Sequence, residues 1–420
     1  MIDRYLNPKI NSIWDDQNKF DTWKLVQEKY VETLEELNIA EKGIAKKINQ
    51  SVVQKDEVHK QEQITNHDLA SFVDILQKKV GEGSNWIHYG LTSSDVVDTS
   101  NSLLMKESLE ILLKLVDDLL NEIKNRAIDE QNTKIIGRTH GVFAEETFLG
   151  NILGNWYLEI KRNLDRLSTA KETISYGKLS GPVGNYTVVT PQIEDKTLKK
   201  LDLKPEKFAS QIVSRDRYAE VVSAISILAS SYDRIAGNLR SYQRSEISEI
   251  FEPFKDGQKG SSAMPHKKNP IGSERISGLS RIIRGYSVSS LENMVLWNER
   301  DISNSSVERI IIPDSFNIIC FMTTELTSII KNMVINYDQI NKNLENAKNK
   351  SISQKVLSEL VNNGIDRDKA YRSIQNLIFE NNSAEELMKS IEEEFNVKLA
   401  NVTNSENIID NNDSFLDKFN

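Results

Sequence analysis

The sequence predicts an all-α fold built around a bundle of long helices, and three observations support this prediction. Only eight of the 420 residues are proline, so long stretches contain no residue that breaks a helix. Apolar residues recur at intervals of three and four, which is the spacing of one helix face. Signals for β-strands are sparse. Long apolar faces favour a bundle that buries them against other helices or against other subunits.

Taken in order, the elements start with residues 1–92, for which we expect several shorter helices. Stretches with helical spacing follow, longer than the usual helix of a globular domain. They are residues 104–123, 148–167, 218–248, 272–297 and 315–345. We interpret their apolar faces as core packing. Between them, residues 174–190 contain glycines and β-branched residues and predict a short hairpin or a loop.

The chain becomes rich in Asn, Lys and Glu after about residue 341, and there we expect short helices again. The sequence therefore predicts three helical domains. They are an N-terminal domain over residues 1–92, a central long-helix bundle over residues 93–341 and a C-terminal domain over residues 342–420.

The overall charge and composition exclude several classes of protein. The formal net charge is -9, which argues against a general nucleic-acid binder but not against a local basic pocket. Cys320 is the single cysteine, and charged residues stand where a signal segment would be apolar, so we expect a reducing cytoplasm. No run of 18 apolar residues is present, so we expect no membrane partner. The absence of CxxC and HExxH argues against a zinc site.

Four of the five histidines stand in polar clusters rich in glycine and hydroxyl side chains. The clusters are TNHDLASF (65–72), NWIHYGLTSSDVVDTSN (85–101), GRTHGVFAEE (137–146) and GSSAMPHKKNP (260–270). Histidine is the side chain best suited to proton transfer near neutral pH. A lone histidine is usually structural or solvated, but this grouping favours an acid/base site. His59 lies on a charged helix face, and we set it aside.

Two further segments allow a functional and an ordinary interpretation. Residues 257–270 are not a phosphate-binding P-loop, because Lys259 precedes Gly260 and no apolar strand leads in. From composition alone, a solvated loop and a catalytic segment remain equally good interpretations. Arg300 and Arg309, with serines between them, are suited to bind a phosphate or carboxylate, or they form surface salt bridges.

The segment GSSAMPHKKNP resembles the signature GSSxMPxKxNP of the fumarase/aspartase superfamily. Within it, the MPHK histidine, the start MIDRYLNPKINSIW, GRTHG and LWNERDISNSSVERI resemble the adenylosuccinate lyase family. The similarity extends to about residue 380. It implies a homotetramer with a twenty-helix core, in which each active site draws segments from three subunits.

The implied reaction is β-elimination of fumarate from adenylosuccinate to give AMP, a step of purine nucleotide synthesis. The same site would cleave the succinylaminoimidazole carboxamide ribotide (SAICAR) to AICAR. The partner implied is a nucleotide substrate, and the resemblance implies no metal or organic cofactor.

The family's roles carry over to the positions that match its motifs. Ser261 would be the general base, with Ser262 as the alternative, and His140 the general acid that protonates the departing nitrogen. Lys267 and Asn269 would hold the succinyl carboxylates. Positions that match contacts to the succinyl or fumarate group are Thr92, Ser93 and Gln211. Positions that match the nucleotide phosphate site are Arg4, Tyr5, Arg300, Ser305 and Arg309. His67 and Asp68 match a pair that orients His140, and His88 matches a substrate contact.

Several positions depart from the family's usual residues. They are Asn66 for arginine, Phe143 for histidine, Glu146 for proline, and Asn298 and Asn304 for histidines. Because none of them is a proposed acid or base, we expect activity to be kept. Two alternatives to this lyase are a non-catalytic relative with the same bundle and a sister lyase acting on argininosuccinate or another fumarate-yielding substrate. The intact catalytic set argues against the first, and a panel of substrates would separate the second.

Overall fold

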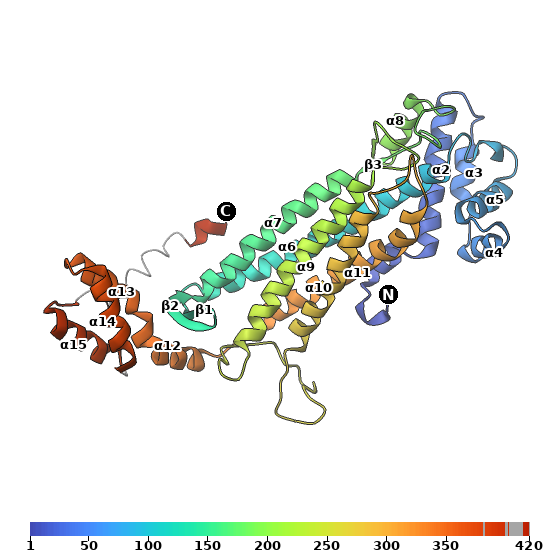
Figure 1. Ribbon diagram of the computed structural model, residues 1–420. Coiled ribbons are helices and arrows are strands. Elements are labelled where there is room, and N and C mark those ends of the chain that lie inside the picture. Colours follow the sequence, from blue (N-terminus) through green and yellow to red (C-terminus); the bar gives the residue numbers. More distant parts are fainter. Residues whose placement is uncertain (381–382, 400–401, 403–414, 420) are drawn as a thin grey trace. The chain divides into compact units, whose positions relative to one another are not determined.

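The computed structural model describes residues 1–380, 383–399, 402 and 415–419, and most of these residues are helical (Figure 1). Within them, the strands form three separate two-stranded sheets. The predicted all-α class is therefore confirmed. No helix among the described residues is long and apolar enough to cross a membrane.

By compactness the chain separates into two units, each assembled from three stretches of sequence. The first unit consists of Met1–Asp117, Arg162–Asp233 and Ile276–Glu325. The second consists of Asp118–Lys161, Arg234–Arg275 and Leu326–Asn420. The three-domain division made from the sequence stays a prediction, because these units follow compactness and divide the long helices instead.

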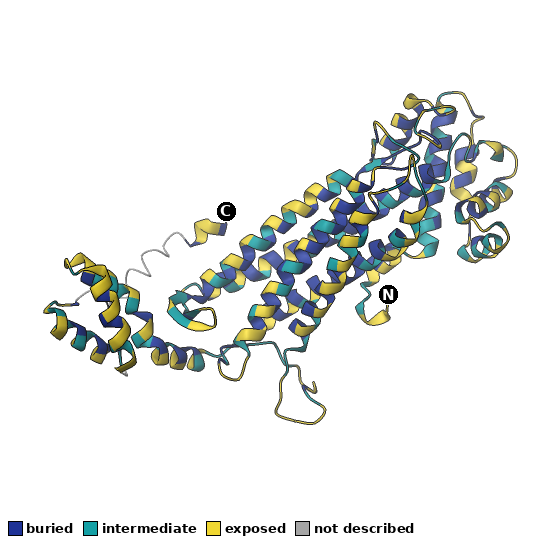
Figure 2. Cartoon of the chain, viewed as in Figure 1, coloured by how far each residue is buried: buried dark blue, intermediate teal, exposed yellow. Residues whose placement is uncertain are grey.

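The long helices lie where the apolar spacing predicts them. They are α6 (Ser93–Asp129), α7 (Leu149–Ile174), α9 (Arg215–Tyr242), α10 (Ile271–Glu292) and α11 (Ser303–Asn332). In the first unit, α9 packs against α10 and α11. The Ser280 hydroxyl on α10 donates to the Ala229 carbonyl oxygen at 2.9 Å, and the Tyr232 and Thr323 hydroxyls lie 3.0 Å apart. Figure 2 shows buried and exposed residues alternating along these helices.

Three of the predicted long segments end earlier than their apolar spacing suggests, and one of them is 272–297, where α10 stops at Glu292. Helix α9 stops at Tyr242, and the backbone then turns through Ser248, whose φ is 52°. The segment 315–345 divides between α11 and α12 (Tyr337–Ser351). Asn336 causes the division, because its side chain accepts the Gln339 N–H and caps the start of α12.

Shorter helices form the N-terminal part of the first unit, as predicted. They are α1 (Pro8–Ile13), α2 (Asp16–Glu36), α3 (Ile44–Gln50), α4 (Lys55–Thr65) and α5 (Asp68–Val80), with single 3₁₀ turns at Asp3–Tyr5 and Ser84–Trp86. Phe20, Trp23 and Phe72 form the aromatic centre of this core, with ring centroids 5.2–6.1 Å apart. Helix α8 (Pro191–Lys200) adds Ile193 and Leu198 to it.

The C-terminal helices form a separate small core in the second unit. They are α12, α13 (Ser353–Asn362), α14 (Arg367–Glu380) and α15 (Ala384–Phe395), and a 3₁₀ turn follows at Leu416–Phe419. Val356, Leu360, Leu387 and Ile391 are buried at the centre of this core.

The strands are short, and one hairpin was not predicted. Strands β1 (Lys134–Thr139) and β2 (Val142–Phe148) pair antiparallel around the GRTHG segment. The predicted hairpin or loop at residues 174–190 is mainly a loop, in which β3 (Tyr176–Gly177) pairs parallel with β4 (Lys204–Pro205). Strand β5 (Ile250–Phe251) pairs antiparallel with β6 (Val334–Ile335).

Candidate active site

The candidate residues divide between the two units. The first unit holds Arg4, Tyr5, His67, Asp68, His88, Thr92, Ser93, Gln211, Arg300, Ser305 and Arg309. The second unit holds His140, Ser261, Ser262, Lys267 and Asn269. The proposed acid and base thus belong to one unit, and most of the proposed substrate-binding residues belong to the other.

The structure brings His67 and Ser93 together in the first unit. His67 is the N-cap of α5, where its Nδ1 accepts the Ala70 N–H, and its Nε2 lies 3.3 Å from the Ser93 hydroxyl. Because Nδ1 is an acceptor, the proton of the neutral imidazole is on Nε2 and points to Ser93.

His88 is held neutral beside them. The Gln27 amide donates to His88 Nδ1 at 3.0 Å, and its oxygen accepts the His88 backbone N–H at 2.9 Å. Burial, followed by the charge of His67, lowers the pKa of His88 to about 4. The imidazole therefore presents an N–H donor at Nε2 and carries no charge at neutral pH.

The segment that carries Thr92 and Ser93 is fixed by a fully buried ion pair. The Asp95 and Lys178 side chains have 0% exposure and are in contact. Asp95 also accepts the Thr92 N–H at 2.7 Å, and Lys178 donates to the Gly181 carbonyl oxygen at 3.0 Å. Sequence analysis did not single out Lys178, whose partner is 83 residues away.

Arg300 and Gln211 are in contact in the first unit, next to Ser94. One guanidinium nitrogen of Arg300 donates to the Gln211 amide oxygen and to the Ser94 hydroxyl, both at 3.1 Å. The Arg300 Nε is buried and has no hydrogen-bond partner among the described residues. This arginine retains donors for an anion.

Arg309, Ser305 and Asp68 form a second group. Arg309 contacts the Asp68 carboxylate at 2.5 Å and the Ser305 hydroxyl at 3.4 Å. Burial alone would raise the pKa of Asp68, but the Arg309 charge and the Leu69 N–H outweigh it, so that the pKa lies below its usual value. These three residues and Arg300 line a cavity of about 210 Å³.

A buried ion cluster forms part of the wall of the same cavity. The Arg215 guanidinium contacts the Asp98 carboxylate at 2.5 and 2.9 Å and the Glu308 carboxylate at 2.8 and 3.1 Å. Asn304, one of the departures from the family, donates to Glu308 at 3.1 Å. Asparagine thus supplies a donor to the cluster without a titrating charge.

Arg4 and Tyr5 lie at the start of the chain. Tyr5 packs edge-on against Phe321, with ring centroids 5.3 Å apart, and Arg4 is exposed. Their roles at a phosphate site stay predictions.

In the second unit, the signature loop is tied at its base and exposed at its tip. The Asn269 amide donates to the Gly260 carbonyl oxygen at 2.9 Å, and the Gln243 amide donates to the Lys268 carbonyl oxygen at 2.9 Å. A Cβ at Gly260 would lie 2.1 Å from the Lys267 carbonyl oxygen, so glycine is required there for close approach. Ser262 and Lys267 are exposed.

Ser261 stands at the start of this loop with its hydroxyl turned to the backbone. Its Oγ accepts the Met264 N–H at 3.0 Å and the Ala263 N–H at 3.2 Å. Two N–H donors stabilise negative charge on that oxygen, which is what a serine needs in order to act as a base. The structure describes no hydrogen bond to the Ser262 hydroxyl.

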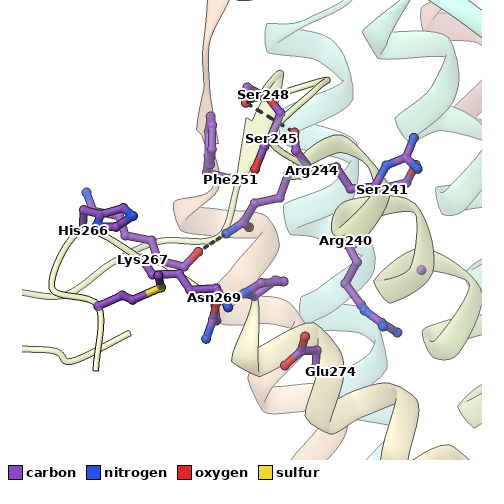
Figure 3. A pocket seen from close by; sticks show the side chains of 15 residues that line it. Arg240, Ser241, Arg244, Ser245, Ser248, Phe251, His266, Lys267, Asn269 and Glu274 are labelled. Atoms are coloured by element: carbon purple, nitrogen blue, oxygen red, sulfur yellow. Dashed lines mark hydrogen bonds between the residues drawn. The ribbon is translucent and has the colours of Figure 1, made fainter. Parts of the chain in front are cut away.

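A cavity of about 840 Å³ opens between the end of α9 and the loop, and Figure 3 shows its lining residues. Lys267 and Asn269 line it, together with four charged residues that sequence analysis did not single out. These are Arg240, Arg244, Lys268 and Glu274. Their nearness in sequence to the signature motif, at the end of α9, in the segment that follows, and at the start of α10, was the available signal.

His140 lies at the tip of the β1–β2 hairpin. Thr139 pairs with Val142, which leaves His140 and Gly141 as a two-residue turn with φ values of 56° and 80°. Two left-handed residues in sequence form the type I′ turn that joins twisted strands tightly. The imidazole is exposed, and no described residue bonds to it.

The second unit contains an imidazole and a serine oxygen that accepts two N–H groups, which are side chains suited to proton transfer. The first unit separately contains arginines whose forked donors suit a phosphate or carboxylate. Among the described residues, no group of three or more His, Cys, Asp or Glu side chains is arranged to hold a metal ion.

Comparisons of the sequence with known proteins identify relatives that are lyases. The chain matches the model of a family described as Lyase over residues 13–285. It is 44% identical to an adenylosuccinate lyase of Thermotoga maritima over 379 residues, which cover 89% of this chain and 87% of the relative. It is 40% identical to an adenylosuccinate lyase of Bacillus subtilis over 376 residues, with 89% and 87% covered.

Solved structures show the same fold at low identity. A fumarate lyase from Mesorhizobium sp. BNC1 superimposes with a TM-score of 0.85 at 18% identity, covering 98% of this chain and 95% of the other. A β-carboxy-cis,cis-muconate cycloisomerase from Acinetobacter calcoaceticus superimposes with a TM-score of 0.86 at 19% identity, covering 98% of each chain.

Proposed function

The chain belongs to the adenylosuccinate lyase family, and from this premise we propose that Ser261 and His140 carry out its reaction. The reaction is that of a carbon–nitrogen lyase, in which adenylosuccinate gives fumarate and AMP in purine nucleotide synthesis. SAICAR, which carries the same succinylamino group, gives fumarate and AICAR.

The two proton transfers are assigned to the two residues of the second unit. The Ser261 oxygen removes a proton from the succinyl carbon next to a carboxylate. The electron pair left on carbon forms the double bond of fumarate as the carbon–nitrogen bond breaks. His140 donates a proton to the nitrogen as it departs. A hydrogen beside a carboxylate is weakly acidic, so Lys267 and Asn269 are assigned to stabilise the dianion that develops.

The observation that carries this proposal is the pair of N–H groups directed at Ser261 Oγ. A serine is a poor base in water, and two N–H donors to its oxygen lower the cost of its alkoxide. Ser262, whose hydroxyl has no described partner, is the alternative base, and parallel alanine variants distinguish the two.

The first unit is assigned to substrate binding. Arg300, Arg309 and Ser305 would hold the nucleotide phosphate, with Arg4 and Tyr5 added to them. When the substrate binds, the Arg309 guanidinium would leave the Asp68 carboxylate for the phosphate or bind both, since carboxylate and phosphate are both anions. Thr92, Ser93, Gln211 and the N–H of His88 would contact the succinyl group, and His67 with Asp68 would orient the acid.

We further propose that the chain acts as a homotetramer whose sites combine segments of three subunits. Exposed apolar residues along α10 and the turn after it support this, because water-facing side chains of this kind usually meet a partner. They include Val288 (60% exposed), Leu291 (50%), Val295 (77%) and Trp297 (79%). The cytoplasmic location expected from sequence also stays a proposal.

The test is release of fumarate by the purified protein from adenylosuccinate and, separately, from SAICAR. We expect both to be cleaved, each giving one fumarate per nucleotide product. No fumarate at high enzyme concentration would contradict the assignment. Faster release from argininosuccinate than from either nucleotide would favour the sister lyase.

A further inference from the structure

Arg138 lies two residues before the proposed acid, on the strand that leads to the hairpin tip. The tip itself is exposed at His140, so little at the tip determines where the imidazole points. The direction of the hairpin must therefore be set nearer its base. The Arg138 side chain is 14% exposed, and it turns inward rather than toward solvent.

Glu249 receives the Arg138 side chain in a two-pronged ion pair. The two terminal nitrogens of Arg138 donate to the two Glu249 carboxylate oxygens at 2.7 and 2.9 Å. The Glu249 side chain is 0% exposed. Such a pair fixes orientation as well as distance, because both planar groups must align.

A third residue completes the arrangement from α12. The Asn343 amide donates to Glu249 Oε1 at 2.8 Å and to the Ile247 carbonyl oxygen at 2.9 Å. Gln339 donates to the Asn343 amide oxygen at 2.9 Å. The carboxylate that holds Arg138 is thus held in turn by a helix.

Phe143 covers the outer side of Arg138. The two residues are cross-strand partners, and the guanidinium carbon lies 5.4 Å from the centre of the ring. Lys350 lies 5.9 Å from the same ring. Phenylalanine at this position, which departs from the family's usual histidine, shields the ion pair from water and so strengthens it.

We propose that Arg138 is a positioning residue that acts through Glu249 to aim His140. Glu249 directly precedes β5, from which the chain runs to the signature loop. One buried carboxylate therefore anchors the hairpin with the proposed acid and begins the segment with the proposed base. The inference rests on the proposed function, because it assigns a role in the reaction that Ser261 and His140 perform.

The test is a double-mutant cycle on fumarate release. Arg138→Gln should lower kcat by about 100-fold, the effect of a catalytic group misplaced by about 1 Å, while KM changes by less than about threefold. In a His140→Gln background the same change should cost less than about twofold, since Arg138 has nothing left to aim. Arg138→Lys should recover the melting temperature but little of kcat, because the fork is lost.

Lys134→Gln is the matched control in the same hairpin. It removes a charge whose nitrogen lies 3.6 Å from Glu146, on the half of the hairpin away from the tip, and kcat should not change. A kcat within about threefold of wild type in Arg138→Gln would overturn the inference. So would a double variant in which Arg138→Gln lowers kcat by the same factor in the His140→Gln background as in wild type. Should Arg138→Gln fail to fold, Arg138→Lys carries the same cycle. Unchanged kcat in His140→Gln alone would instead overturn the acid role within the proposed function.

Discussion

The proposed substrate-binding residues of the first unit and the proposed catalytic residues of the second unit are held in opposite ways. Beside Thr92, the Asp95–Lys178 pair is completely buried, and Arg215 joins two further carboxylates in the wall of the cavity that Arg300 and Arg309 also line. The loop that follows Ser261 and the hairpin tip at His140, by contrast, are exposed, and only the bases of their segments are tied down.

The difference indicates a division of labour within one chain. Buried ion pairs are costly to desolvate, but once formed they hold their helices in one register. Such a framework suits the binding of a charged substrate without rearrangement. Exposed loops tied at their bases suit groups that must open for substrate and then exclude water.

Replacing the proposed base should cause the largest effect. Ser261→Ala should lower kcat toward the upper end of roughly 10²–10⁴-fold, because no other group would accept the proton, while substrate still binds. Fumarate release measures kcat, and isothermal titration with adenylosuccinate measures binding. Ser262→Ala is the control, and a loss confined to Ser262→Ala would transfer the base role to Ser262.

Replacing the proposed acid should have the next largest effect. His140→Gln should lower kcat toward the lower end of roughly 10²–10⁴-fold, since water substitutes in part for a lost proton donor. The exposed position of His140 means that the melting temperature should stay the same. If the loss of kcat came together with a lower melting temperature, His140 would have a structural role, and the comparison between the two units would be contradicted.

Breaking the buried framework should affect stability instead of chemistry. Lys178→Met leaves Asp95 buried without a charged partner, which should cost about 3–5 kcal/mol of unfolding free energy. Urea unfolding measures it. Lys204→Met, which removes a surface pair with both side chains at least 60% exposed, should cost less than about 1 kcal/mol. Similar costs for both variants would contradict the difference between the two regions.

The smallest expected effect is the loss of stability that His88 causes at acid pH. Its folded pKa of about 4 lies below the unfolded value of 6.5, so only the unfolded chain gains this proton between those values. Stability should therefore be retained above pH 6.5 and fall as pH drops toward 4, by about 1–2 kcal/mol at pH 5. His88→Asn should remove this part of the loss, and an unchanged pH profile would show that His88 titrates normally.

The sequence predicted the long helices well but not the hairpin that carries His140. Apolar spacing in α6 and α7 is a local signal, and both segments are helices in the structure. The hairpin turn uses His140 and Gly141 instead of the common Asn-Gly, so composition offered little sign of it. The Arg138–Glu249 pair spans 111 residues, and no local pattern predicts such a contact.

The candidate site was predictable mainly through the family signature. Ser261, Lys267 and Asn269 follow from matched positions, and so do Arg300 and Arg309. What the signature did not indicate is how they are held: the Ser261 oxygen facing two N–H groups, Asn269 closing its own loop, and Lys178 buried against Asp95. These contacts arise from backbone turns and burial, which depend on the folded chain as a whole.

The most direct test of the division of labour is complementation between inactive subunits. Ser261→Ala disables the proposed chemistry, and Arg309→Glu should disable binding by repelling the substrate phosphate. If each site combines segments of different subunits, mixed tetramers reassembled from equal amounts should regain about one quarter of wild-type fumarate release. Activity no higher than that of the two variants alone would mean that each site is built within one chain, and would contradict the account.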